Sequence, residues 1–163
     1  CGLRVSELCN LKLSDLYFEE GFIKVEGKGS KQRLVPISPR AIKEIKYWLT
    51  DRSLGKIKKG YEDYVFLARW GNNISRIMVF HMIKELAEKT GITKNISPHT
   101  FRHSFATHLL EGGANLRAIQ CMLGHESIAT TEIYTHIDRN MLRSEIIEHH
   151  PRNIKYRKER GIY

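Results

Sequence analysis

The spacing of apolar residues changes along the chain and divides it into predicted helices and strands. In residues 2–13 the apolar side chains fit one side of a helix; they are Leu3, Val5, Leu8 and Leu11. Residues 16–18, 22–26 and 33–37 instead form short runs rich in β-branched and aromatic residues, separated by turns that contain glycine. These three runs predict a small antiparallel sheet.

The remainder of the chain is predicted to be mainly helical, because capping residues and apolar stripes recur along it. Each expected helix begins after a Ser, Asn or Asp that suits the N-cap position, and three of them end at glycine. The starting residues are Ser38, Ser75, Ser97, Asn115 and Asp138, and the closing glycines are Gly91, Gly112 and Gly124. Residues 65–67 predict a brief strand, and residues 152–160 a loose basic tail. The pattern therefore indicates an α+β domain that is mainly α.

The helix that begins at Pro98 carries candidate chemistry in its first turn. His99 and Arg102 are three residues apart and share one face, where free backbone N–H groups and the positive end of the helix dipole favour an anion. That anion is expected to be a phosphate. Phe101, Phe105 and Leu109 recur every four residues and predict an ordinary core face on the other side, so either polar residue alone is also compatible with a surface role.

The net charge of the chain indicates more about its function than its length does. The 163 residues suit one domain, contain no apolar run long enough to span a membrane, and carry 27 Lys and Arg against 18 Asp and Glu. The formal net charge of +9 is typical of nucleic-acid binders, although ribosomal and membrane-surface proteins share it.

The cysteines point away from disulfide and zinc frameworks. Cys1, Cys9 and Cys121 are odd in number and form no CxxC pair, so a reducing cytoplasm is the simplest setting. The chain opens on Cys1 directly into a helical pattern, with no signal peptide, and we expect it to be a fragment of a longer protein.

Two further positions are candidates for an anion site. Arg4 and Glu7 lie three apart on the first helix, so Glu7 is placed to hold Arg4, although an arginine on a helix is more often solvated. Lys28 lies in a glycine-flanked hairpin turn, from which a long side chain can reach a ligand; lysines also protect sheet edges without any such role.

His99 and His103 have the spacing of a zinc-binding helix. The residue after His99 is Thr100, however, and not the Glu that a zinc protease uses as its base. No metal is expected.

Five motifs together resemble a known family. They are Gly-Leu-Arg-Val-Ser-Glu-Leu at 2–8, Gly-Lys-Gly at 27–29, His-Thr-Phe-Arg-His at 99–103, Leu-Gly-His at 123–125 and Ile-Tyr-Thr-His at 133–136. In this order and spacing they look like the catalytic signature of the tyrosine recombinases, also called phage integrases, and in particular of their Xer branch.

The resemblance implies a role for each matching residue. Arg4 and Arg102 would clamp the scissile phosphate, and Tyr134 would attack phosphorus to leave a 3′-phosphotyrosyl link. Lys28 would protonate the leaving 5′-oxygen, and His99 would accept or tune the tyrosine proton. Two other roles follow: His125 would hydrogen-bond the phosphate, while Glu7 and His103 would support the site. The resemblance implies no metal, no ATP and no other cofactor.

The resemblance also implies partners and domains. Residues 1–150 would be the catalytic domain of a site-specific DNA recombinase, and residues 151–163 would be its basic tail. An N-terminal core-binding domain would be absent. We therefore expect a monomer that binds double-stranded DNA weakly. Candidate DNA contacts are Lys31, Arg33, Arg76 and Thr100.

Further protomers would complete a tetramer on DNA. The apolar side of the last helix, Leu142 to Ile147, would dock into a neighbouring protomer or pack on its own core. The alternative functions are DNA relaxation by a type IB topoisomerase mechanism and a non-catalytic DNA-binding module.

Overall fold

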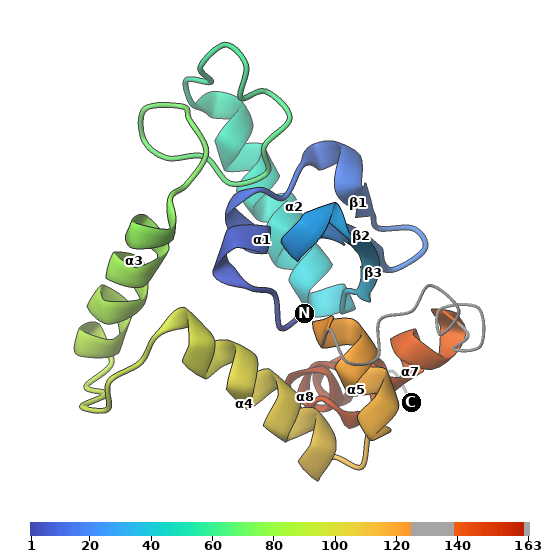
Figure 1. Ribbon diagram of the computed structural model, residues 1–163. Helices are drawn as coiled ribbons and strands as arrows, with labels where there is room; N and C mark the ends of the chain where they lie inside the picture. Colours follow the sequence, from blue (N-terminus) through green and yellow to red (C-terminus); the bar gives the residue numbers. More distant parts are fainter. Residues whose placement is uncertain (125–138, 162–163) are drawn as a thin grey trace.

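The computed structural model describes residues 1–124 and 139–161 and has a small sheet surrounded by helices (Figure 1). The described helices are α1 Val5–Cys9, α2 Pro39–Leu54, α3 Arg76–Lys89, α4 Pro98–Glu111, α5 Leu116–Leu123, α7 Arg139–His149 and α8 Pro151–Glu159. Short 3₁₀ turns, η1 Leu13–Asp15 and η2 Lys28–Ser30, interrupt the first part of the chain. The α+β class with a mainly helical content is confirmed.

The sheet has three antiparallel strands in the order β1-β2-β3, namely Leu16–Tyr17, Phe22–Glu26 and Gln32–Pro36. Ile23 pairs with Leu16 on one side and with Val35 on the other, so the register places apolar side chains next to each other across all three strands. The predicted sheet is therefore confirmed to within one residue at the strand ends.

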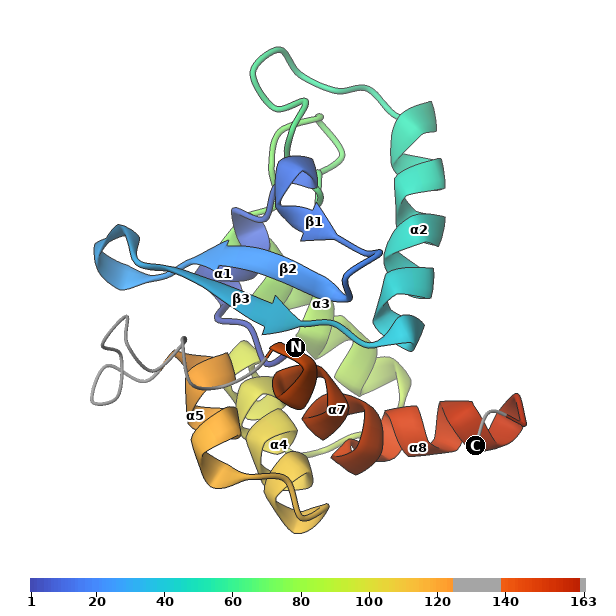
Figure 2. The same cartoon turned by 90° about the vertical axis from the view of Figure 1, so that its right-hand side faces the viewer.

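The protein has two hydrophobic cores, and both include residues of the sheet. One packs the sheet against α2 and the segments that flank α1, and it includes Ile23, Val35 and Val65, all nearly inaccessible to solvent. The other joins α4, α5 and α7 around Leu109 and Met122, and reaches the sheet through Phe22. Figure 2 shows α2 along one side of the sheet and α4, α5 and α7 below it.

Local capping signals position the helices as predicted. Ser75 accepts from the N–H of Met78 at 3.1 Å and begins α3, and Asn115 accepts from the N–H groups of Arg117 and Ala118 to begin α5. Gly124 ends α5 in the left-handed conformation, with φ at +64°. Of the apolar face predicted on α4, Phe105 and Leu109 are buried, whereas Phe101 is exposed.

Two predicted elements are shorter than expected. The first helix spans only Val5–Cys9, because Gly2 has φ at +60° and Asn10 closes the helix at its other end. Residues 65–67 form no strand; the segment makes only isolated bridges, Lys12 with Tyr64 and Leu67 with Asn73. Apolar spacing encodes neither the backbone conformation at Gly2 and Asn10 nor the partners of residues 65–67.

The C-terminal part differs more clearly from the prediction. Residues 151–159 form helix α8 and are not a loose tail: Pro151 occupies the first turn, and buried Asn153 donates from Nδ2 to the carbonyl of Ile146 at 3.0 Å. Among the described helices, none combines the length and apolar character needed to cross a membrane.

The apolar side of α7 faces the protein's own core. Leu142 is 2% exposed and Ile146 is also buried, and both pack with residues of α4 and α5. Of the two placements expected for this side, packing in the same chain is the one observed. The docking of this side into a neighbouring protomer stays a prediction, which the burial of Leu142 and Ile146 in their own chain does not favour.

Candidate functional site

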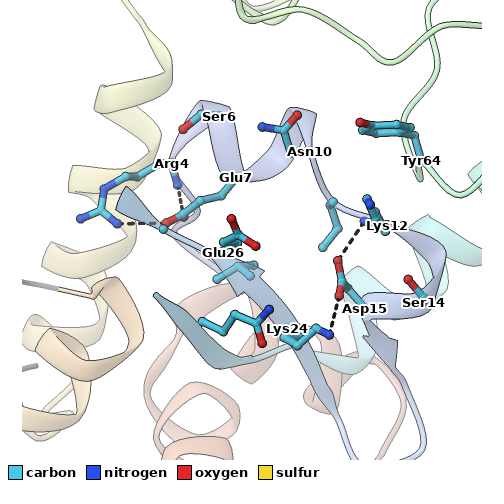
Figure 3. Close-up of a pocket in the computed structure, with 14 residues that line it drawn as sticks. Arg4, Ser6, Glu7, Asn10, Lys12, Ser14, Asp15, Lys24, Glu26 and Tyr64 are labelled. Atoms are coloured by element: carbon cyan, nitrogen blue, oxygen red, sulfur yellow. Dashed lines mark hydrogen bonds and ion pairs between the residues drawn. The ribbon is translucent and has the colours of Figure 1, made fainter. Parts of the chain in front are cut away.

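The site begins at the N-terminus of α1, where Arg4 and Glu7 hold each other. The backbone N–H of Arg4 donates to Oε2 of Glu7 at 2.7 Å, and its Nη1 donates to Oε1 at 2.9 Å. The carboxylate thus satisfies a free N–H at the helix start and also fixes the guanidinium. Figure 3 shows both bonds, with the Arg4 side chain extending away from the loop that carries Lys12.

Arg102 comes from the second turn of α4 and reaches the same region. Its Nη1 donates to the carbonyl of Gly2 at 2.6 Å and its Nη2 to the carbonyl of Leu123 at 2.5 Å. Burial, and after it the positive charge of Arg4, lowers the pKa of Arg102 to about 10. The guanidinium remains protonated at neutral pH, so the site holds two cations close together.

The end of α5 is the common anchor of three arginines. The last carbonyls of a helix have no partner within it and carry the negative end of its dipole, so cations are favoured there. Residues 122–124 each accept a hydrogen bond from a different arginine. The pairs are Arg33 Nε with Met122 at 2.9 Å, Arg102 Nη2 with Leu123 at 2.5 Å, and Arg4 Nη2 with Gly124 at 3.0 Å.

Arg33 does not occupy the place predicted for it. It is 7% exposed on β3, and its Nη1 and Nη2 donate to the two carboxylate oxygens of Glu7 at 2.7 and 3.0 Å. A guanidinium buried in this way does not face a DNA backbone, so we correct the prediction of a DNA contact. Side chains alternate along a strand, and Arg33 shares the inward face with Val35; this alternation is the signal that the prediction missed.

The start of α4 presents several predicted residues to solvent. His99, Thr100 and His103 are all exposed. The hydroxyl of Thr100 accepts from the N–H of Ser97 at 3.1 Å and lies 3.3 Å from the Ser97 hydroxyl, so it is engaged in capping the helix. His99 therefore stands one turn before Arg102 on a helix whose N-terminus is accessible.

The hairpin between β2 and β3 carries the predicted lysines. Lys28 lies in η2, and the turn is closed by the N–H of Gly27, which donates to the carbonyl of Lys31 at 2.8 Å. Gly29 has φ at +72°, a conformation that allows the chain to reverse here. Lys31 is exposed beside this turn, and Arg76 is exposed at the first position of α3. His125 and Tyr134 lie outside the described residues.

A cavity of about 650 Å³ adjoins Arg4 on the side of the sheet (Figure 3). Its charged lining is balanced, with three cations and three carboxylates: Arg4, Lys12, Lys24, Glu7, Asp15 and Glu26. Lys24 pairs with Asp15 at 3.2 Å. This cavity therefore offers no excess of positive charge, and the arginines at the end of α5 are the better candidate for binding phosphate. Within residues 1–124 and 139–161, no group of three His, Cys, Asp or Glu side chains is placed to hold a metal ion.

Comparison with known proteins gives one consistent result. The sequence model described as the phage integrase family matches residues 1–141. Tyrosine recombinase XerD of Chlorobaculum tepidum is 50% identical over 151 residues, which cover 93% of this chain and 50% of the relative. The corresponding protein of Staphylococcus saprophyticus is 46% identical over 93% of this chain and 51% of its own length. The chain thus spans about half the length of the curated relatives it matches.

Solved structures agree with the sequence matches. The crystal structure of XerA recombinase superposes with a TM-score of 0.71 and 38% identity, covering 92% of this chain and 54% of that one. XerH site-specific recombinase, solved bound to its difH substrate as a pre-cleavage complex, gives a TM-score of 0.67 at 32% identity, with 83% of this chain and 39% of that one covered.

Proposed function

Because this chain belongs to the phage integrase family of tyrosine recombinases, we propose that it cleaves and rejoins DNA strands at a specific site. The observation that carries the proposal is the convergence of Arg4 and Arg102. Arg4 immediately precedes α1 and Arg102 lies on α4, 98 residues further along the chain, yet they donate to the neighbouring carbonyls of Gly124 and Leu123. Such a pair of protonated guanidinium groups matches the two non-bridging oxygens of a phosphodiester.

The chemistry assigned to the site is nucleophilic displacement at phosphorus. The phenol oxygen of Tyr134 forms a bond to phosphorus while the bond to the deoxyribose 5′-oxygen breaks, leaving a 3′-phosphotyrosyl ester. Arg4 and Arg102 stabilise the negative charge that grows on the non-bridging oxygens in the transition state. Because the ester conserves the energy of the broken bond, a 5′-hydroxyl can reverse the step and rejoin the strands.

Two protons move in this reaction. A phenol has an ordinary pKa near 10, and an alkoxide leaves poorly, so both ends of the displacement need help. His99, exposed at the start of α4, is the proposed acceptor of the tyrosine proton, and Lys28, in the hairpin turn, is the proposed donor to the 5′-oxygen. His125 is proposed to hydrogen-bond the phosphate, and Glu7 and His103 to support the site.

Double-stranded DNA is the proposed substrate and partner. The net charge of +9 favours a polyanion, and the XerH relative was solved on its DNA substrate. Lys31, Thr100 and Arg76 are exposed and remain proposed contacts to DNA. Assembly of four protomers on DNA is proposed for the whole protein, with a contact other than the buried side of α7. The relatives are named tyrosine recombinases, so DNA relaxation of the topoisomerase type is not favoured.

Covalent trapping tests the proposal. Nicked duplexes of varied sequence release a short strand on cleavage, so religation is prevented and the protein stays attached. The chain and its Tyr134→Phe variant are incubated with the pool at low salt, with EDTA, because phosphate contacts weaken steeply as salt rises. We expect a denaturant-stable adduct from the parent chain alone, and sequencing of its DNA gives the preferred site. An adduct from both proteins, or from neither, would contradict the proposal.

A further inference from the structure

Arg33 is buried between the catalytic arginine Arg4 and the end of α5, and every nitrogen of its guanidinium is engaged. Nη1 and Nη2 bind the carboxylate of Glu7 at 2.7 and 3.0 Å, and Nε binds the carbonyl of Met122 at 2.9 Å. Three directional bonds in a buried site fix this side chain more firmly than any one bond would. Arg33 is therefore a rigid connection between β3, α1 and α5.

The charge balance around Glu7 depends on Arg33. Glu7 is 4% exposed, and two guanidinium groups share its single negative charge. Burial alone would raise the pKa of Glu7, but hydrogen bonds from Arg33 and from the backbone of Arg4 hold it below the ordinary value. If Arg33 were absent, Arg4 would be the remaining arginine paired with this carboxylate. Its charge would then be cancelled one to one, in surroundings where charges interact strongly.

The same geometry affects the direction of the Arg4 side chain. Arg4 now gives Nη1 to Glu7 and Nη2 to the carbonyl of Gly124, so its guanidinium lies between the two. Without Arg33, each oxygen of Glu7 loses one of its two donors, so both oxygens can accept from the Arg4 guanidinium in a bidentate pair, which draws it away from Gly124.

We infer that Arg33 is a positioning residue for strand cleavage. It neutralises the carboxylate of Glu7 and binds the carbonyl of Met122, so that the positive charge of Arg4 remains uncompensated and its guanidinium stays directed at the scissile phosphate. This inference rests on the proposed function and assigns Arg33 no contact with DNA.

The test compares Arg33 variants with a matched change on the same strand. Arg33→Met removes the charge, Arg33→Lys keeps it without the bidentate fork, and Val35→Ala weakens the same strand at a buried apolar position of the core. Single-turnover adduct formation is measured at saturating DNA, on the site enriched by trapping, together with the Kd for DNA. All proteins are assayed well below their melting temperatures.

The expected pattern separates positioning from folding. Arg33→Met lowers the cleavage rate about 100-fold and Arg33→Lys about 10-fold, with Kd changed less than about 3-fold, as for loss of charge stabilisation in the transition state. Val35→Ala stays within about 2-fold of the parent rate once it is folded, because it removes only packing. If Arg33→Met leaves too little folded protein, Arg33→Lys takes its place, and the same comparison of the two substrates is made with it.

A second substrate gives a readout that a purely structural role would not change. A methylphosphonate at the scissile position replaces one charged non-bridging oxygen by a methyl group and lowers the demand for the charge of Arg4. We expect the rate ratio of phosphodiester to methylphosphonate to fall about 10-fold or more in Arg33→Met and to be unchanged in Val35→Ala.

The outcomes are distinguishable. If Arg33→Met slows both substrates equally, or matches Val35→Ala, the positioning role is wrong while the proposed function stands. If the parent chain itself forms no adduct that depends on Tyr134, the proposed function fails and the inference fails with it.

Discussion

Glu7 accepts two hydrogen bonds from Arg4, one from its backbone N–H at 2.7 Å and one from its Nη1 at 2.9 Å. One carboxylate therefore begins helix α1 and also orients the arginine that precedes it. Since Glu7 is almost fully buried, the pair is part of the protein's interior as well as of the proposed site. Changes at Glu7 should consequently affect stability and cleavage together.

The first prediction concerns the charge of Glu7. Glu7→Gln leaves the buried guanidinium of Arg33 and the partly exposed one of Arg4 without a counter-charge, and we expect it to lower the free energy of unfolding by about 3 kcal/mol at pH 7. Urea denaturation followed by circular dichroism measures this change. Glu85→Gln is the matched control, because Glu85 forms an exposed pair with Lys89 at 2.7 Å, and its loss should change stability by less than about 0.5 kcal/mol.

Acid should remove the difference between the parent chain and Glu7→Gln. The pKa of Glu7 is held below its ordinary value of 4.5, so its contribution to stability is present at neutral pH and is lost as the pH falls through the folded-state value. The two proteins should therefore converge in stability well below pH 4.5. Equal effects of the Glu7 and Glu85 substitutions at pH 7 would show that the buried ion pairs are not what stabilises α1.

The second prediction concerns the glycine that ends α5. Gly124 has φ at +64°, and a Cβ there would lie 3.0 Å from Nε of Arg33, which is fixed by its own hydrogen bonds. Gly29 has φ at +72°, but a Cβ there meets nothing within 4 Å. We expect Gly29→Ala to cost about 1 kcal/mol for backbone strain alone, and Gly124→Ala roughly 2–4 kcal/mol because it adds the clash. Similar losses in thermal or urea unfolding would contradict the contact with Arg33.

Sequence patterns predicted those parts of the fold that depend on near neighbours. Ser75, Asn115 and Gly124 act within one turn of their own helix ends, so the sequence locates those ends well. The helical tail was missed because α8 is stabilised by contacts to other helices, such as the bond from Asn153 to Ile146. Its many charged residues gave no apolar stripe to indicate a helix.

In the candidate site too, the sequence predicted contacts between near neighbours and missed contacts between distant residues. Arg4 and Glu7 are three residues apart, and their spacing alone predicted the pair. Arg33 reaches Glu7 from another element, and a partner 26 residues away leaves no periodic signal. The inward position of Arg33 could be derived from strand alternation, but the carbonyl of Met122 that it binds could not, because that depends on how α5 packs against β3.

The third prediction concerns pH between about 4 and 6.5. The ring of His150 packs against Phe105 at 5.4 Å and faces His108 at 6.1 Å between centroids. Burial, followed by the positive charges of His108 and Arg152, lowers the pKa of His150 from 6.5 to about 4. The unfolded chain binds more protons in this window, so stability should fall by roughly 2 kcal/mol as the pH drops across it, allowing for partial solvent exposure.

His150→Asn is the control for this effect. Asparagine can replace the bond that Nδ1 of His150 accepts from the N–H of Arg152 at the start of α8, but it does not titrate. Urea midpoints of the two proteins are compared at several pH values. A parallel decline in both would assign the pH dependence to other groups.

The fourth prediction tests the placement of α7 in its own core. Leu142 is 2% exposed, whereas the adjacent Met141 is 38% exposed. Leu142→Ala should lower the free energy of unfolding by about 2–5 kcal/mol, and Met141→Ala by less than about 1 kcal/mol. Sedimentation velocity under conditions where both variants are folded should give the same mass. If Leu142→Ala kept its stability but reduced assembly on DNA, the residue would act between protomers after all.

The last prediction asks what the shape of a guanidinium contributes at Arg102. Arg102→Lys keeps a positive charge but loses the fork that now binds the carbonyls of Gly2 and Leu123. One ammonium group cannot reach both carbonyls and both non-bridging oxygens, so we expect covalent adduct formation to fall about 100-fold or more and stability by about 1–3 kcal/mol.

Arg40→Lys is the control, because Arg40 pairs with Glu44 on the surface of α2 and should show neither change. The pKa of Arg102, about 10, keeps the parent group protonated at neutral pH. Burial and the charge of Arg4 act on a lysine here as well, so the deficit is measured at both pH 7 and pH 8, and loss of the fork alone gives the same deficit at both. A deficit that disappeared at either pH would assign the loss to titration, and equal rates for Arg102→Lys and the parent chain would remove Arg102 from the phosphate clamp.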